Sequence, residues 1–172
     1  MSIAVIGMGT NMGKRFENIK KAVEALKLLP GTQVLRASHV YETIPVSDID
    51  QPKFLNVNIE LETNMSPMAL LGACLGIEAA MGRVRTVKDG PRVIDLDLLL
   101  YEGVKNESFE LTLPHPRILE RAFVMIPMKD LFPEGRAPGL FFEPYLKGIS
   151  YAGVKRFEKD LEISVTADGI LM

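Results

Sequence analysis

Cysteine, tryptophan and net charge are nearly absent from this chain of 172 residues, which has one cysteine, no tryptophan and a net charge of −2. The single cysteine, Cys74, excludes an internal disulfide and is typical of a reducing cytosol. The small net charge gives no global attraction to nucleic acid or to an anionic membrane. No apolar run reaches bilayer length, and the first one ends at Gly7, too early for a signal peptide. We therefore expect a cytoplasmic protein that binds neither a membrane nor nucleic acid.

Apolar residues make up 47% of the sequence, enough to bury one core. We expect a single domain over residues 1–172, acting as a monomer. Cys74 lies among leucines at helical spacing, so we expect it to pack inertly in that core.

Hydrophobic periodicity and turn residues divide the first part of the chain into alternating strands and helices. We expect strands at residues 3–8, 34–43, 54–62 and from Asp95, and helices at 14–29 and 67–81. Ser66 and Pro67 supply the N-cap and first-turn proline of the second helix. The order βαββαβ is typical of a ferredoxin-like α+β sandwich, an antiparallel sheet with two helices on one face.

The remaining chain has weaker patterns. We expect a hairpin through Gly103, a short helix at residues 117–123, a charged helix at 154–161 and a last strand at 163–166. Residues 136–172 form an extension of unknown role, for which the simplest interpretation is a cover for a sheet edge.

Two carboxylates, Asp95 and Asp97, interrupt an otherwise apolar strand. Side chains two apart on a strand share a face, with α-carbons about 6–7 Å apart, while Ile94, Leu96 and Leu98 fill the other face. Two like charges this close repel unless cations compensate them. We therefore expect metal ions, or a metal and arginines, opposite this pair.

A basic loop precedes these carboxylates and carries Arg83, Arg85, Lys88 and Arg92 against one acid, Asp89. Guanidinium groups match phosphate oxygens, and carboxylates hold the Mg²⁺ that bridges them. The combination predicts phosphoryl-type transfer from a nucleotide, with two magnesium ions between the carboxylates. The loop alone would be equally typical of a solvated surface.

Three other motifs fail on spacing. The glycines from Gly7 to Gly13 lack the third glycine of a dinucleotide fingerprint, since Met12 stands there, and lack the Ser or Thr of a Walker A loop, since Arg15 stands there. We expect these glycines to form a tight turn close to a neighbouring element or ligand. A calcium loop from Asp95 fails because Leu100 replaces its glycine.

The segment Leu113-Pro114-His115-Pro116-Arg117 leads into the expected short helix. His115 alone would be weak evidence for a site. Arg117 and Arg121 are four residues apart, which on a helix would place them on one face as a second phosphate clamp.

Six ordered blocks resemble the 6-hydroxymethyl-7,8-dihydropterin pyrophosphokinases of folate biosynthesis over about residues 3–135. They are Gly9-Thr10-Asn11-Met12-Gly13, Tyr41-Glu42-Thr43, Phe54-Leu55-Asn56, Gly82-Arg83-Val84-Arg85, Gly90-Pro91-Arg92-Val93-Ile94-Asp95-Leu96-Asp97, and Pro114-His115-Pro116-Arg117 with Arg121-Ala122-Phe123. The resemblance implies transfer of pyrophosphate from ATP to the pterin's hydroxymethyl group, releasing AMP.

The resemblance also implies roles for individual residues. Asp95 and Asp97 would hold two Mg²⁺ ions, with Arg83 and Arg92 steadying the triphosphate during transfer. The other ATP contacts would be Glu78, Arg85, Thr112, His115 and Arg121. The pterin would lie between Phe54 and Phe123 and be recognised by Thr43, Val46, Asn56 and Asp95.

Three positions depart from the family pattern: Asp89 replaces an aromatic, Leu75 a polar residue and Glu110 an arginine of some members. A second hypothesis is a non-catalytic nucleotide- or RNA-binding module, because ferredoxin-like sheets often bind RNA through aromatics. Paired carboxylates would repel an RNA backbone unless metal were present. We expect the loops at 45–52 and 82–91 to act as lids.

Overall fold

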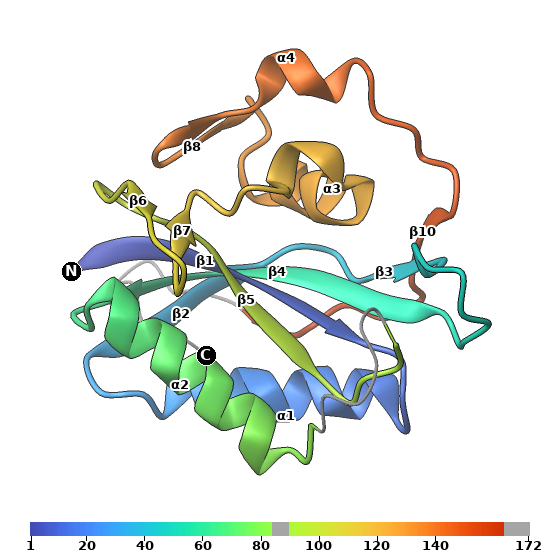
Figure 1. The fold of residues 1–172 in the computed structure, drawn as a ribbon, viewed down its shortest axis with the longest axis horizontal. Helices are drawn as coiled ribbons and strands as arrows, with labels where there is room; N and C mark the ends of the chain where they lie inside the picture. The colour runs from blue at the N-terminus through green and yellow to red at the C-terminus, as the bar shows by residue number, and fades with distance from the viewer. Residues whose placement is uncertain (84–89, 164–172) are drawn as a thin grey trace.

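A computed structural model describes residues 1–83 and 90–163 of the chain. Its first half follows the expected element order: β1 (Ser2–Thr10), α1 (Arg15–Lys27), β2 (Thr32–Ala37), β3 (Tyr41–Thr43), β4 (Phe54–Thr63), α2 (Pro67–Ala80) and β5 (Asp95–Tyr101). These strands form one antiparallel sheet in the order β3-β4-β1-β5, with β2 also paired to β4 (Figure 1). The ferredoxin-like α+β prediction is confirmed.

The strand expected at residues 34–43 is broken in two. Both pieces pair with the same edge of β4. β2 lies opposite residues 59–63 of β4, and β3 lies opposite residues 54–56. Between them the Ser38 backbone N–H donates to Asn58 O at 2.9 Å, while the Ser38 hydroxyl accepts from the Asn58 N–H at 2.9 Å. The Ser38 hydroxyl thus takes the place of a backbone carbonyl as acceptor, which interrupts the strand ladder and lets the chain bend.

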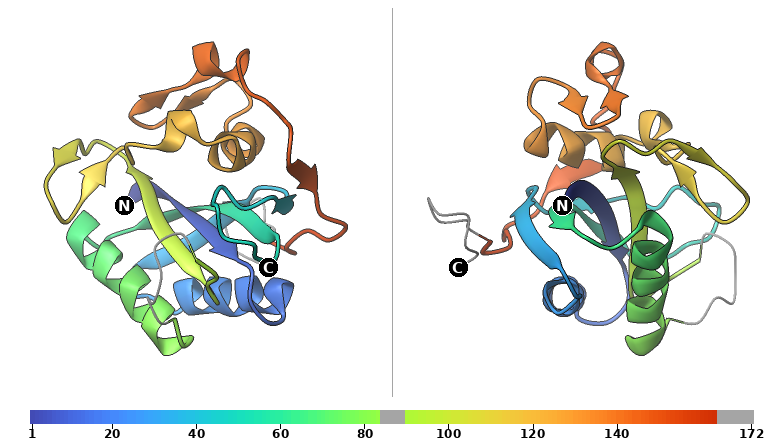
Figure 2. Two further views of the ribbon diagram at one scale, coloured as in Figure 1. Left: turned by 45° about the vertical axis from the view of Figure 1, so that its right-hand side comes forward. Right: turned by 90° about the vertical axis from the view of Figure 1, so that its left-hand side faces the viewer.

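The two faces of the sheet are covered differently (Figures 1 and 2). Ala4, Ile6 and Met8 of β1 alternate toward α1 and α2, where Cys74 is fully buried in the main core. Val5 and Leu99 face the other way and pack under α3 (Ala122–Leu131) and Phe142. Period-two alternation of apolar side chains on both faces produces this three-layer arrangement.

The second helix begins as the sequence predicts. Ser66 Oγ accepts the Ala69 N–H at 3.2 Å, and Pro67 occupies the first turn, where a missing N–H removes no helical bond.

The segment after β5 differs from expectation. The hairpin turns at residues 108–111, between β6 (Asn106–Glu107) and β7 (Thr112–Leu113), and Gly103 lies in the turn before it. In place of a helix at 117–123, one 3-10 turn (Ile118–Glu120) precedes α3. α3 continues to Leu131 because its apolar side chains are buried together with Phe142. The helix predicted from local turn residues ended earlier, at residue 123.

The C-terminal extension contains β8 (Arg136–Ala137), β9 (Leu140–Phe141), α4 (Glu143–Leu146) and β10 (Val154–Arg156). The helix expected at 154–161 is wrong, because β10 pairs with the edge of β3 and tertiary pairing overrides local propensity. Residue 163 is not in a strand, and residues 164–166 of the expected last strand lie outside the described residues. Pairing of β10 confirms that the extension covers a sheet edge. Among residues 1–83 and 90–163, no helix could span a membrane.

Candidate active site

A groove of about 820 Å³ opens on the face of the sheet opposite α1 and α2. Its floor consists of β1, β4 and β5, and its walls are the loop after β3, the start of α3 and the C-terminal extension. This volume is in the range of small-molecule sites.

Two cross-strand rows of side chains form the floor. Asn56, Gly9 and Asp95 are register partners across β4, β1 and β5, and Asn58, Gly7 and Asp97 form the next row. A Cβ on Gly9 would lie 3.0 Å from Asn56 Nδ2, and one on Gly7 would lie 3.1 Å from Leu99 Cδ1. The glycines therefore clear the floor between polar side chains. They lie within β1, so the tight turn expected of the whole glycine cluster is confined to Asn11–Lys14, where Gly13 has φ +69°.

The carboxylates Asp95 and Asp97 share the groove face as the strand period predicts, while Leu96 and Leu98 point into the main core. Asp95 is paired with Arg83 and accepts from Arg92 Nη1 at 3.3 Å. Burial, followed by the charges of Asp95 and Glu78, raises the pKa of Asp97 to about 7. Burial and the two neighbouring carboxylates thus disfavour the charged form of Asp97 more than Arg121 and Arg83 favour it.

Arg83 and Glu78 lie behind Asp95 rather than in the lining of the groove. Arg83 Nη1 is 3.0 Å from Glu78 Oε1, and Glu78 Oε2 accepts the Leu96 backbone N–H at 2.7 Å. Glu78 is only 3% exposed. The pair supports the start of β5 from below, and contact of either residue with ATP stays a prediction.

The residues predicted for the pterin come together in the groove: Thr43, Val46, Phe54, Asn56, Asp95 and Phe123. Thr43 Oγ donates to Asn56 Oδ1 at 2.6 Å, which orients the buried amide. The guanidinium of Arg92 lies 5.6 Å from the Phe54 ring centre, and that of Arg121 lies 5.6 Å from the Phe123 ring centre. Each aromatic is thus held beside a cation at the groove wall.

Arg117 and Arg121 both line the groove, although not on one helical face. They flank the 3-10 turn, and Arg121 has extended backbone just before α3. The expected convergence therefore arises from a turn, because the helix starts only at Ala122.

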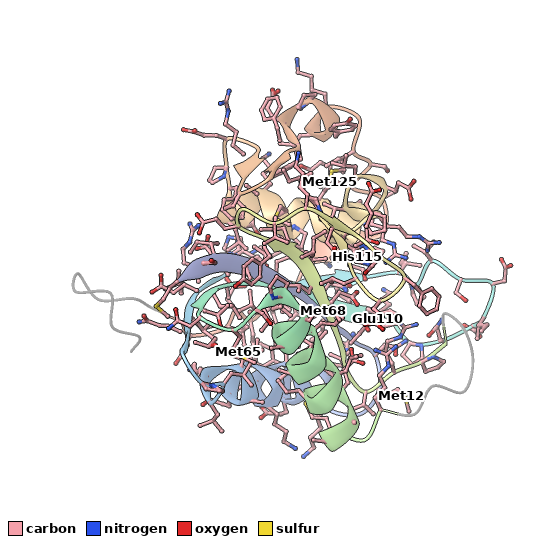
Figure 3. The ribbon with its side chains drawn as sticks, turned by 60° about the vertical axis from the view of Figure 1, so that its left-hand side comes forward. Met12, Met65, Met68, Glu110, His115 and Met125 are labelled. Carbon is pink, nitrogen blue, oxygen red and sulfur yellow. The ribbon has the colours of Figure 1, made fainter. Side chains whose placement is uncertain are left out.

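His115 and Thr112 lie outside the groove lining. The His115 backbone N–H donates to Leu99 O at 2.7 Å, and burial, together with Arg121 and Arg117, lowers the pKa of the His115 ring. Figure 3 shows His115 with Met125 of α3 above it and Met68 of α2 below it. The hydroxyl of Thr112 bonds Ser108 O at 3.4 Å. Arg85 and Asp89 lie outside the described residues.

One wall of the groove consists of residues that the sequence did not predict. Ser150, Ala152, Gly153 and Val154 of the extension line it, beside the loop that carries Ile44 and Val46. No local pattern marks these residues, because their place depends on where β10 pairs.

The fold and the groove define an α+β protein with a small-molecule site whose paired carboxylates and arginines suit a phosphorylated ligand. The chain belongs to the 7,8-dihydro-6-hydroxymethylpterin-pyrophosphokinase (HPPK) family, whose model matches residues 5–133.

Named relatives agree with the family match. A 2-amino-4-hydroxy-6-hydroxymethyldihydropteridine pyrophosphokinase of Methylorubrum extorquens is 40% identical over 92% of this chain and 100% of its own length. The protein of the same name from Bacillus subtilis is 40% identical over 76% of this chain and 78% of its own. The folic acid synthesis protein fol1 of Schizosaccharomyces pombe is 47% identical, but this chain spans only 18% of it.

Solved structures share the fold. An HPPK-DHPS crystal structure in complex with substrates has a TM-score of 0.65 at 16% identity and covers 90% of this chain and 46% of its own. Plasmodium falciparum HPPK-DHPS has a TM-score of 0.62 at 16% identity over 91% of this chain and 47% of its own.

Proposed function

We propose that this chain transfers pyrophosphate from ATP to the hydroxymethyl group of 6-hydroxymethyl-7,8-dihydropterin in folate biosynthesis. The hydroxymethyl oxygen forms a bond to the β-phosphorus. The bond between the β-phosphorus and the α,β-bridging oxygen breaks, and AMP leaves with that oxygen. The observation that carries this proposal is the pair Asp95 and Asp97 on the floor of a groove that is also lined by Phe54, Asn56 and Phe123. A non-catalytic RNA-binding module is not favoured, since the named relatives are pyrophosphokinases.

The donor set of the groove fits magnesium. Within the described ranges no cluster of three or more His, Cys, Asp or Glu side chains could hold a metal by itself. Magnesium commonly takes one or two carboxylates and completes its coordination with water and substrate phosphates. Asp95 and Asp97 would hold two Mg²⁺ ions, which supply charge neutralisation of the triphosphate when bound.

The arginines act on the anionic substrate. Arg92, Arg117 and Arg121 line the groove that contains the carboxylates, and Arg92 Nη1 also donates to Asp95 Oδ2 at 3.3 Å. Arg83 is already bound to Asp95, so it places that carboxylate and adds positive charge beneath it. Stabilising the negative charge that develops on the α,β-bridging oxygen as it leaves with AMP is the main task of such a site.

The pterin would lie at the aromatic end of the groove. Phe54 and Phe123 offer ring faces for stacking, and Thr43 fixes the Asn56 amide that reads the pterin's polar edge. A ligand without the matching acceptors would leave the buried N–H groups of this amide unpaired, which costs binding. A monomeric state and a cytoplasmic location complete the proposal.

Turnover tests the function directly. The purified chain is incubated with ATP, Mg²⁺ and 6-hydroxymethyl-7,8-dihydropterin, and the products are separated by chromatography. AMP and the pterin diphosphate in equal amounts support the proposal. Formation of ADP, or no pterin-dependent loss of ATP, contradicts it.

A further inference from the structure

A segment beyond the family match closes one side of the groove. Residues 150–154, here called the strap, lead from the segment after α4 into β10, whose first residue is Val154, and four of the five line the groove. Figure 1 shows the extension descending from α4 past α3 to β10 at the edge of the sheet, and Figure 2 shows the same course from a second side. The family model ends at residue 133.

The strap is fixed at both ends. Just before it, Leu146 and Ile149 pack, partly buried, against the cluster that contains Met125 and Met128 of α3. At its other end β10 pairs with β3, so that Val154 is the register partner of Thr43. A short segment with apolar packing before it and a strand ladder at its end has little freedom of its own.

The strap holds the start of the loop that follows β3. The Ile44 backbone N–H donates to Gly153 O at 2.9 Å, one residue beyond the Thr43 side chain that orients Asn56. Ile44 and Val46 are 57% and 80% exposed, so the loop has little buried surface to order it. The strap therefore restrains the start of this loop, which is not held by buried side chains.

Gly153 is suited to this place. Its φ is +75°, and a Cβ there would meet the Ile44 side chain at 3.4 Å. A residue with a side chain would strain the backbone at this positive φ and so disturb the carbonyl that holds the loop. Its neighbour Ala152 leaves the groove open beside it, since a bulky side chain there would extend into the lined space.

We propose that the strap is a positioning element for the pterin end of the site, with Gly153 as its main positioning residue, a proposal that rests on the proposed function. By holding residues 43–46 in place before substrate arrives, the strap reduces the ordering cost of pterin binding. It lies beside Thr43 and the loop, so its effect falls on the pterin and not on ATP.

A matched pair of glycine variants tests the strap. Gly153→Ala and Gly139→Ala both place alanine at a positive φ in the extension, but Gly139 is in the β8–β9 turn with open space around it. We expect Gly153→Ala to raise the KM for the pterin about tenfold, whereas Gly139→Ala changes it less than about twofold. In both variants the KM for ATP should stay within about twofold of the wild type.

A second pair tests the open space and keeps the proposal testable if Gly153→Ala folds poorly. Ala152→Phe should weaken pterin binding about tenfold or more, while Gly148→Phe, placed earlier in the extension where no atom lies within 4 Å of an added Cβ, should not. Isothermal titration with the pterin, and separately with α,β-methylene-ATP and Mg²⁺, measures each binding step without turnover.

The outcomes separate the two proposals. A wild-type chain that forms no AMP from ATP and pterin overturns the proposed function. A wild type that turns over, together with strap variants whose pterin affinity is unchanged or whose pterin and ATP affinities fall equally, overturns the strap proposal alone. A selective loss of pterin affinity in Gly153→Ala and Ala152→Phe, absent from both controls, supports it.

Discussion

The hydroxyl of Thr43 donates a 2.6 Å hydrogen bond to Oδ1 of Asn56, and both residues are buried at the floor of the groove. One amide oxygen is thereby satisfied within the protein, and the amide's remaining groups are aimed by this bond. The geometry of the amide that we propose reads the pterin thus depends on a residue of the neighbouring strand.

Thr43→Val keeps the shape of the side chain and removes this donor. We expect the KM for the pterin to rise about tenfold, or about 1–2 kcal/mol, because the Asn56 amide loses its orientation and a buried oxygen loses its partner. Thr32→Val is the control, since Thr32 and Thr63 form a similar hydroxyl pair, 2.7 Å apart, that does not line the groove. Steady-state kinetics in both substrates provide the measurement, and equal effects of the two variants would contradict the prediction.

Asp97→Asn should nearly abolish turnover and leave the fold intact. It should also remove a pH-dependent loss of folding stability that Asp97 causes in the wild type. The folded pKa of Asp97, about 7, lies above its unfolded value of about 4, so ionisation of Asp97 destabilises the folded protein as pH rises between these values.

Urea denaturation without Mg²⁺ measures this effect. The stability of Asp97→Asn relative to the wild type should increase from pH 5 to pH 8 by on the order of 1–4 kcal/mol. Added Mg²⁺ should shrink the difference at pH 8 by stabilising the wild type. If the difference in unfolding free energy between the two proteins depends on neither pH nor Mg²⁺, the ionised Asp97 does not destabilise the fold.

The periodicity of one strand was enough to predict that two carboxylates share one face of the sheet. Alternation in β5 placed Asp95 and Asp97 together because side-chain direction in a strand depends only on sequence parity. The break at Ser38 was not predictable, since it depends on bonds to Asn58 in another strand.

The C-terminal wall was beyond local patterns for a related reason. Val154–Arg156 follows glycine and carries two cations, and only the free edge of β3 makes it a strand. Residues 150–154 reach the groove as a consequence of that pairing. Sequence patterns therefore identified residues whose direction is set within a single strand. They missed residues whose position depends on the pairing of two strands that are far apart in the sequence.

Cys74 should be unreactive in the folded protein. It is fully buried, and burial, followed by the charges of Glu78 and Asp97, raises the pKa of its thiol to about 12. With DTNB at pH 8 the folded chain should react only as fast as it unfolds, whereas the chain in urea should react at once with one thiol per molecule. Rapid labelling of the folded chain would contradict burial in the core.

The tail beyond β10 is tied to the break between β2 and β3 by Asp160. Its carboxylate accepts from His39 Nδ1 at 2.8 Å, from the Val40 N–H at 3.1 Å and from Arg156 Nη2 at 3.1 Å. Burial alone would raise the pKa of Asp160, but these hydrogen bonds outweigh it and lower the pKa below its usual value.

A carboxylate with a lowered folded pKa stabilises the protein above its unfolded pKa of about 4, and this contribution is lost as pH falls through the folded pKa. Asp160→Asn should therefore cost about 0.5–1 kcal/mol at pH 6, a modest value because the side chain is partly exposed, and progressively less below pH 4. Glu158→Gln, at an exposed carboxylate of the same tail, is the control and should be nearly neutral at both pH values. Urea denaturation at pH 6 and pH 3.5 compares them, and a cost of Asp160→Asn that grows on acidification would show that the hydrogen bonds do not favour the charged form.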